Sequence, residues 1–135
     1  MKIVVDTYAW IELLIGTEKG KKVKQILENA QEIYTPSIVL AEAARKFLRE
    51  GNDENTILNW LDVITATSTI TQIDPTIALE AAKCQLLLAE KAKKSRQNTP
   101  SLFDAIVLAT CVVHQCKVLT GDEHFKDLPE TIWLS

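Results

Sequence analysis

Four acidic side chains lie where an alternating strand-and-helix chain could gather them into one site: Asp6, Glu42, Asp104 and Asp122. Carboxylates held within a few ångströms of one another repel strongly, and a hard divalent cation removes that repulsion. An oxygen-only ligand set, with no paired histidine or cysteine nearby, favours Mg²⁺ or Mn²⁺ over Zn²⁺. Such a metal polarises a phosphate and lowers the pKa of a bound water, so the pattern predicts phosphoryl chemistry.

The first two acids also have ordinary structural explanations. Asp6 directly follows the β-branched run Ile3-Val4-Val5, and it could simply cap the next helix. Glu42 stands among apolar neighbours, where a carboxylate without a partner is costly to bury. Arg45 and Arg49 follow it at helical spacing and could pair with it instead.

The other two acids have similar alternatives. Asp104 lies three residues after Ser101, which is capping-box spacing with Asp in place of the usual Glu or Gln. Asp122 follows Val118-Leu119-Thr120 and could be an ordinary turn residue. All four acids nevertheless fall at the carboxyl ends of strands or near helix starts, so together they favour a shared site.

Short β-branched segments alternate with amphipathic helical patterns along the chain. We expect strands near residues 2–5, 32–35, 67–73, 117–120 and 131–134. We expect helices over residues 8–14, 18–30, 36–50, 54–65, 75–94 and 102–115, with Thr35, Asp74 and Ser101 as caps. This alternation predicts an α/β fold with a parallel sheet covered by helices on both sides. Right-handed crossovers would then bring the strand-to-helix transitions, and the acids, to one edge.

Composition limits the class of protein. A chain of 135 residues with 47% hydrophobic residues is expected to form a single domain over residues 1–135. The net charge of −3 gives no global basic field, and no glycine-rich phosphate loop is present. Without an apolar run long enough for a bilayer or a signal-peptide pattern, we expect a cytoplasmic protein with no membrane partner. The three cysteines, Cys84, Cys111 and Cys116, are expected to be packing residues.

The acidic segments, taken in order, resemble the PIN-domain ribonucleases. The resemblance depends on Asp6-Thr7, Glu42, Leu102-Phe103-Asp104-Ala105-Ile106-Val107-Leu108-Ala109 and Leu119-Thr120-Gly121-Asp122, and it spans essentially the whole chain. Among PIN domains, the small stand-alone form is similar to the VapC toxins of type II toxin–antitoxin modules. The resemblance implies a PIN-like three-layer α/β/α sandwich with a central, mostly parallel sheet.

The same resemblance implies a function and a set of roles. It implies a Mg²⁺- or Mn²⁺-dependent endoribonuclease, usually a homodimer, that is inhibited by a VapB-type antitoxin. By analogy, the catalytic residues and metal ligands, direct or through water, are Asp6, Glu42, Asp104 and Asp122. Thr120 matches the small hydroxyl residue often found beside the last acid.

Basic residues could supply the contacts to RNA phosphates. We expect the main group to enter the loop before Asp104: Lys91, Lys93, Lys94 and Arg96. Two weaker groups are Lys19, Lys21 and Lys22, and Arg45, Lys46 and Arg49. Each group could equally be a solvated helix face. Residues 95–100 match no pattern of the family, which leaves the choice of substrate open.

Apolar residues exceed what one small core needs, which favours an association surface. The surplus lies in Trp10, Ile11, Leu13 and Leu14, and in the consecutive leucines Leu86, Leu87 and Leu88. Three consecutive leucines on a helix point in directions about 100° apart, so one core does not easily cover all of them. Neighbouring helices of the same domain are the alternative cover.

Two other functions remain open at this level. The chain could be a non-catalytic PIN-like binding module in an RNA or protein assembly, although a complete set of acids argues against a degenerate domain. It could also be a phosphatase or phospho-acceptor of doubly wound type. That class usually carries Asp-x-Asp after the first strand, whereas this chain has Asp6-Thr7-Tyr8.

Overall fold

The computed structural model describes residues 1–135, and its centre is a five-stranded sheet in which every neighbouring pair of strands is parallel. The strand order is β3-β2-β1-β4-β5. The strands are β1 (Lys2–Val5), β2 (Glu32–Pro36), β3 (Thr69–Thr71), β4 (Lys117–Thr120) and β5 (Thr131–Trp133). The first strand of the chain is therefore the middle strand of the sheet, paired with β2 on one side and β4 on the other.

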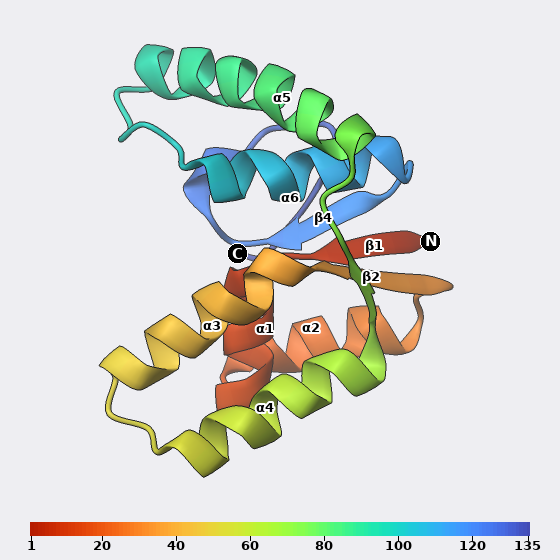
Figure 1. The fold of residues 1–135 in the computed structure, drawn as a ribbon, viewed down its shortest axis with the longest axis vertical. Helices are drawn as coiled ribbons and strands as arrows, with labels where there is room; N and C mark the ends of the chain where they lie inside the picture. Colours follow the sequence, from red (N-terminus) through yellow and green to blue (C-terminus); the bar gives the residue numbers. More distant parts are fainter.

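Helices cover both faces of this sheet, which confirms the predicted three-layer α/β/α architecture (Figure 1). In Figure 1, α5 (Pro75–Lys94) and α6 (Leu102–Val113) lie on one face. The other face carries α1 (Thr7–Ile15), α2 (Glu18–Glu28), α3 (Ser37–Arg49) and α4 (Glu54–Thr67). A short 3₁₀ helix, η1 (Glu123–Phe125), follows β4. No helix combines the length and the apolar character that crossing a bilayer would require.

The β-branched opening run forms the middle of the core. Ile3, Val4 and Val5 are at most 1% exposed, as expected for a strand covered on both faces. Helix α6 is buried continuously from Ala105 to Cys111 because it lies between α5 and the sheet. Its position explains why this helix has the most apolar sequence in the chain. The three cysteines are buried and unpaired, as expected for packing residues.

Two local predictions about this half of the sheet were wrong. Thr35 does not cap α3: it ends up fully buried in β2, where its hydroxyl accepts a hydrogen bond from Trp10 Nε1 at 3.0 Å. The same hydroxyl lies 2.8 Å from Ser68 Oγ. Strand β3 covers only Thr69–Thr71, because α4 continues to Thr67, where the predicted strand was expected to begin.

The remaining caps follow the predicted chemistry. Asp74 accepts from the backbone N–H of Ile77 at 2.8 Å, and a proline opens α5 after it. Ser101 and Asp104 form the reciprocal capping box at the start of α6. Gly51 follows the end of α3 with a φ of +88°, in the left-handed region that glycine adopts easily.

Helices α1 and α2 approach each other closely at Gly20. A β-carbon built on Gly20 would lie 2.1 Å from the carbonyl oxygen of Glu12, which belongs to α1. Glycine therefore permits the two helices to meet backbone to backbone, and Gly20 is buried at this contact.

Candidate active site

The pairing of β1 with β4 brings two of the four acids together at the carboxyl edge of the sheet. Val5 lies opposite Leu119 in the ladder, and the next backbone N–H, that of Asp6, donates to the Leu119 carbonyl at 3.2 Å. Asp122 follows β4 by two residues. The register of two strands far apart in the sequence thus places Asp6 and Asp122 side by side.

A single hydroxyl connects these two acids. Thr120 Oγ1 donates to Asp6 Oδ2 at 2.8 Å and accepts from the backbone N–H of Asp122 at 3.0 Å. Thr120 is fully buried and Asp6 is only 4% exposed. Burial raises the pKa of Asp6 to about 7; the bond from Thr120 works against this rise, and the charges of Asp122 and Asp104 add to it.

Glu42 extends from α3 toward the same edge. Thr7 Oγ1, one residue after Asp6, donates to Glu42 Oε1 at 3.2 Å. Partial burial raises the pKa of Glu42, the bond from Thr7 opposes this, and the charge of Asp104 raises it further. No ion pair joins Glu42 to an arginine; Arg45 contributes only a nearby positive charge that lowers the pKa.

Asp104 caps α6 and also lies among the acids, so a capping role is compatible with the expected place in the site. Its Oδ2 accepts from the backbone N–H of Ser101 at 3.1 Å, while its own N–H donates to Ser101 Oγ at 3.1 Å. The same carboxylate faces the other acids. Burial raises the pKa of Asp104, and the charge of Asp122 raises it further. The cap fixes the carboxylate at the position where the acids converge.

A histidine joins the acids, and the sequence interpretation missed it. His124 Nδ1 lies 3.4 Å from Asp104 Oδ2 and 3.4 Å from Asp122 Oδ1. The sequence analysis expected oxygen-only ligands with no paired histidine nearby, whereas the structure places this single histidine beside two of the acids. Helix η1 turns the chain back at this point: Asp122 Oδ1 accepts from the backbone N–H of His124 at 2.9 Å. The available signal was a histidine two residues after the last acid.

The loop before α6 reaches the site through this histidine. His124 Nε2 lies 2.8 Å from the carbonyl oxygen of Asn98. A polar cavity of about 340 Å³ opens beside it, lined by Arg96, Gln97, Asn98, Glu123 and His124. Residues 95–100, which matched no pattern, thus border the acidic site.

Tyr8 forms another part of the rim. A β-carbon on Gly121 would lie 2.4 Å from Tyr8 Cε1, so the ring packs against this glycine beside Asp122. Lys19 Nζ donates to the Tyr8 hydroxyl at 2.8 Å, and this bond raises the pKa of Lys19. One lysine of the weaker predicted RNA-binding group is therefore bonded to a tyrosine whose ring packs against Gly121.

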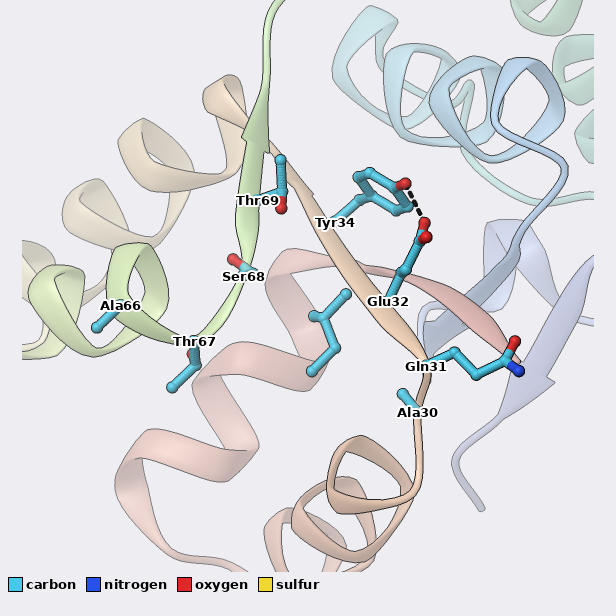
Figure 2. A pocket seen from close by; sticks show the side chains of 9 residues that line it. Ala30, Gln31, Glu32, Tyr34, Ala66, Thr67, Ser68 and Thr69 are labelled. Carbon is cyan, nitrogen blue, oxygen red and sulfur yellow. Dashed lines mark hydrogen bonds between the residues drawn. The ribbon is translucent and has the colours of Figure 1, made fainter.

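A second cavity, of about 610 Å³, lies at the opposite edge of the sheet (Figure 2). It is lined by residues at the start of β2 and β3 and at the end of α4. Figure 2 shows the hydroxyl of Tyr34 bonded to Glu32, which is exposed. This cavity contains no group of converging acids, so the carboxyl edge remains the candidate site.

The donor set at the carboxyl edge fits a divalent cation. No lysine or arginine forms an ion pair with any of the four acids, and His124 is the one basic side chain within 4 Å of them. One ligating atom each from Asp104, Asp122 and His124 lies within 4.8 Å of the others. Uncompensated carboxylates that raise one another's pKa gain most from such an ion.

Comparison with known proteins identifies a family and a fold. The family model for the PIN domain matches residues 3–131. No curated protein has a matching sequence. Among solved structures, a toxin–antitoxin complex from Klebsiella pneumoniae is similar, with 22% identity and a TM-score of 0.68 over 98% of each chain.

Two further solved structures superpose equally well. VapBC2 from Rickettsia felis, bound to a DNA fragment from its promoter, has 14% identity and a TM-score of 0.72, over 98% of this chain and 97% of that one. VapC20 from Mycobacterium tuberculosis, described as a sarcin–ricin loop cleaving toxin, has 16% identity and a TM-score of 0.71, over 91% and 92%. At these identities the likeness establishes the fold.

Proposed function

This chain belongs to the PIN domain family, and from that premise we propose that it is a metal-dependent endoribonuclease acting as a single domain. The proposed ligands of one or two Mg²⁺ or Mn²⁺ ions, direct or through water, are Asp6, Glu42, Asp104 and Asp122. The observation that carries this proposal is the convergence of four carboxylates that no lysine or arginine neutralises.

The chain's own residues would prepare the site for hydrolysis. Thr120 orients Asp6, Thr7 orients Glu42, and the backbone of Ser101 orients Asp104. These bonds hold the carboxylates in place before RNA arrives, so less rearrangement is needed in the transition state. A bound divalent ion would polarise the scissile phosphate and lower the pKa of the attacking water.

The test is RNA cleavage by the purified protein with Mg²⁺ or Mn²⁺ and with a chelator. We expect metal-dependent internal cuts, which mapping of the cut ends would locate, and no covalent phospho-aspartate. The control is Asp104→Asn, which keeps an oxygen to accept from Ser101 and should fold normally while failing to cut. A folded, metal-binding protein that binds RNA without cutting it would favour the non-catalytic binding module.

We also propose that the nuclease is the toxin of a VapBC-type module in the cytoplasm. The similar solved structures include a toxin–antitoxin complex and a toxin described as cleaving the sarcin–ricin loop, which supports this assignment. The partner would be a VapB-type antitoxin. A positively charged side chain of that partner, most plausibly arginine, would pair with the carboxylates and compete with the metal.

For RNA contacts we propose the group at the end of α5 and in the following loop: Lys91, Lys93, Lys94 and Arg96. Arg96 gives the sharpest test, because it lines the cavity beside His124 with a φ of +55°. The N–H of Gln97 donates to the Ala92 carbonyl at 2.9 Å, which closes the end of α5. At helix ends of this kind the left-handed position, occupied here by Arg96, is usually a glycine.

We expect Arg96→Gly to fold at least as stably as the wild type while binding RNA more weakly. Glycine fits the left-handed backbone without the cost of about 1 kcal/mol that a side chain carries there. Losing one phosphate contact should reduce the salt slope of single-stranded RNA affinity by roughly 0.7. Anisotropy titrations at several salt concentrations, with exposed Lys83→Ala as the control, measure this. An unchanged slope would show that Arg96 contacts no phosphate.

We further propose a homodimer. Fewer apolar side chains are exposed for association than the sequence indicated. Trp10 and Leu88 are buried in the core and offer no surface. Leu86 and Leu87 are 72% and 54% exposed on α5, where Leu79 is also exposed. These exposed leucines on one helix are the remaining physical support for an association site.

We expect the wild type to be a dimer in light scattering at micromolar concentration, and Leu86→Lys to be a folded monomer. A buried lysine ammonium at the interface would lack a partner, which strongly disfavours association. Leu58→Lys, at an exposed position of α4, is the matched control and should remain dimeric. A monomeric wild type would remove the dimer from this proposal.

A further inference from the structure

His124 is held from two sides at the edge of the acidic group. On one side, Nδ1 lies 3.4 Å from an oxygen of Asp104 and 3.4 Å from an oxygen of Asp122. On the other side, Nε2 lies 2.8 Å from the backbone carbonyl oxygen of Asn98. The imidazole therefore bridges the loop before α6 and the two acids Asp104 and Asp122.

The partner of Nε2 decides which nitrogen carries the hydrogen. A carbonyl oxygen only accepts, so Nε2 must donate its N–H to Asn98. In the neutral imidazole the lone pair is then on Nδ1, directed toward the two carboxylates. Histidines that bind metals share this arrangement: the remote nitrogen donates to a backbone carbonyl or a carboxylate, which fixes the tautomer and the ring orientation.

We infer that His124 is a nitrogen ligand, through Nδ1, of the divalent ion bound by Asp104 and Asp122. The inference deepens the proposed function, because it depends on a metal at the same site. It assigns a role to residues 95–100: the carbonyl of Asn98 orients a metal ligand.

The nitrogen ligand has a consequence for metal choice. Mg²⁺ prefers oxygen ligands, whereas imidazole suits transition metals, among which Mn²⁺ accepts both. His124 therefore shifts the preference of the site from Mg²⁺ toward Mn²⁺. This preference belongs to the mixed ligand set and would be absent from the four carboxylates alone.

Pulsed EPR of bound Mn²⁺ tests the inference directly, since imidazole nitrogen couples to the metal spin. The chain contains only two histidines, so assignment is simple. His114 lies at the far end of α6, where its ring stacks on Tyr34 at a centroid distance of 4.8 Å. We expect the ¹⁴N coupling in the wild type and in His114→Gln, and its loss in His124→Gln. Labelling only the histidines with ¹⁵N should change the coupling in the wild type itself, independently of any variant.

Calorimetric titration with each metal measures the preference. We expect His124→Gln to lower the affinity for Mn²⁺ by about 10-fold or more, and that for Mg²⁺ by less than about 3-fold. Mn²⁺ binding that depends on Asp104 but shows no nitrogen coupling would overturn this inference and leave the proposed nuclease site intact. A wild type that binds neither metal would overturn both.

Discussion

An Asp6→Asn variant should cut no RNA and should nevertheless unfold at a higher urea concentration than the wild type at pH 8 in the absence of metal. Asp6 is 4% exposed beside the charges of Asp122 and Asp104, so its ionised form is costly to bury. The amide is neutral, nearly the same size, and retains an oxygen to accept from Thr120. The same neutrality removes a proposed metal ligand, so cleavage should fall by several orders of magnitude.

The stability of the metal-free protein should change with pH in one direction. The pKa of Asp6 is about 7 in the folded protein against an ordinary value of 3.8, so the folded state binds the proton more tightly. Stability in the absence of metal is therefore greatest at low pH within this window and decreases as the pH rises from about 4 to about 7. Over this pH range, the contribution of Asp6 to the free energy of unfolding should fall by on the order of 4 kcal/mol. Glu42 and Asp104, whose pKa values are also raised, add in the same direction.

Urea denaturation between pH 5 and 8, without metal, measures this effect. We expect the wild type to lose stability across the range and Asp6→Asn to lose much less. Asp62→Asn, which neutralises an exposed acid on α4, should follow the wild type. Addition of Mn²⁺ at pH 8 should stabilise the wild type but not Asp6→Asn, since a ligand that binds only the folded state raises stability. A wild type that becomes more stable from pH 5 to 8 would contradict the prediction.

Gly20→Ala should lower the free energy of unfolding by about 3 kcal/mol or more, although alanine favours a helix by about 1 kcal/mol over glycine. The added β-carbon would lie 2.1 Å from the Glu12 carbonyl oxygen, and backbone cannot move aside as a flexible side chain could. Helix α2 must then separate from α1. Because Lys19 precedes Gly20 and bonds Tyr8, we also expect the rim of the acidic site to shift.

Thermal and urea denaturation of Gly20→Ala, compared with the wild type, give the size of the loss. Lys22→Ala, a substitution by the same residue at an exposed position of α2, should change stability by less than about 0.5 kcal/mol. Equal or greater stability of Gly20→Ala would show that the two helices can separate at little cost.

The sequence was informative wherever local chemistry decides the structure. The run Ile3-Val4-Val5 can satisfy its apolar side chains only inside a covered sheet, and the structure buries all three. Asp74 and Ser101 cap helices because short polar side chains reach the free N–H groups of the next turn. The convergence of acids at one sheet edge followed from parallel topology alone.

The failures have a common cause in contacts between distant segments. Thr35 is a good capping residue by type, but Trp10, 25 positions earlier, brings an indole N–H that binds its hydroxyl. His124 joins the acids only because Asn98 and Asp104, from another loop and helix, meet it there. Trp10 counted as surplus apolar surface in the sequence, whereas the structure buries it completely. Local patterns carry no signal for the partners of Thr35 and Trp10, whereas for His124 the position two residues after Asp122 was a signal.

The central position of β1 imposes an order on the synthesis of the candidate active site. β1 is made first but pairs on one side with β4, so the sheet stays open along that side until Lys117–Thr120 has been translated. Asp6 and Asp122 are separated by roughly ten seconds of translation at ordinary rates. A ribosome-bound nascent chain therefore carries the first acid, and later Glu42 and Asp104, without an assembled centre. We expect the growing polypeptide to be harmless to the message that encodes it until the last acid has been added.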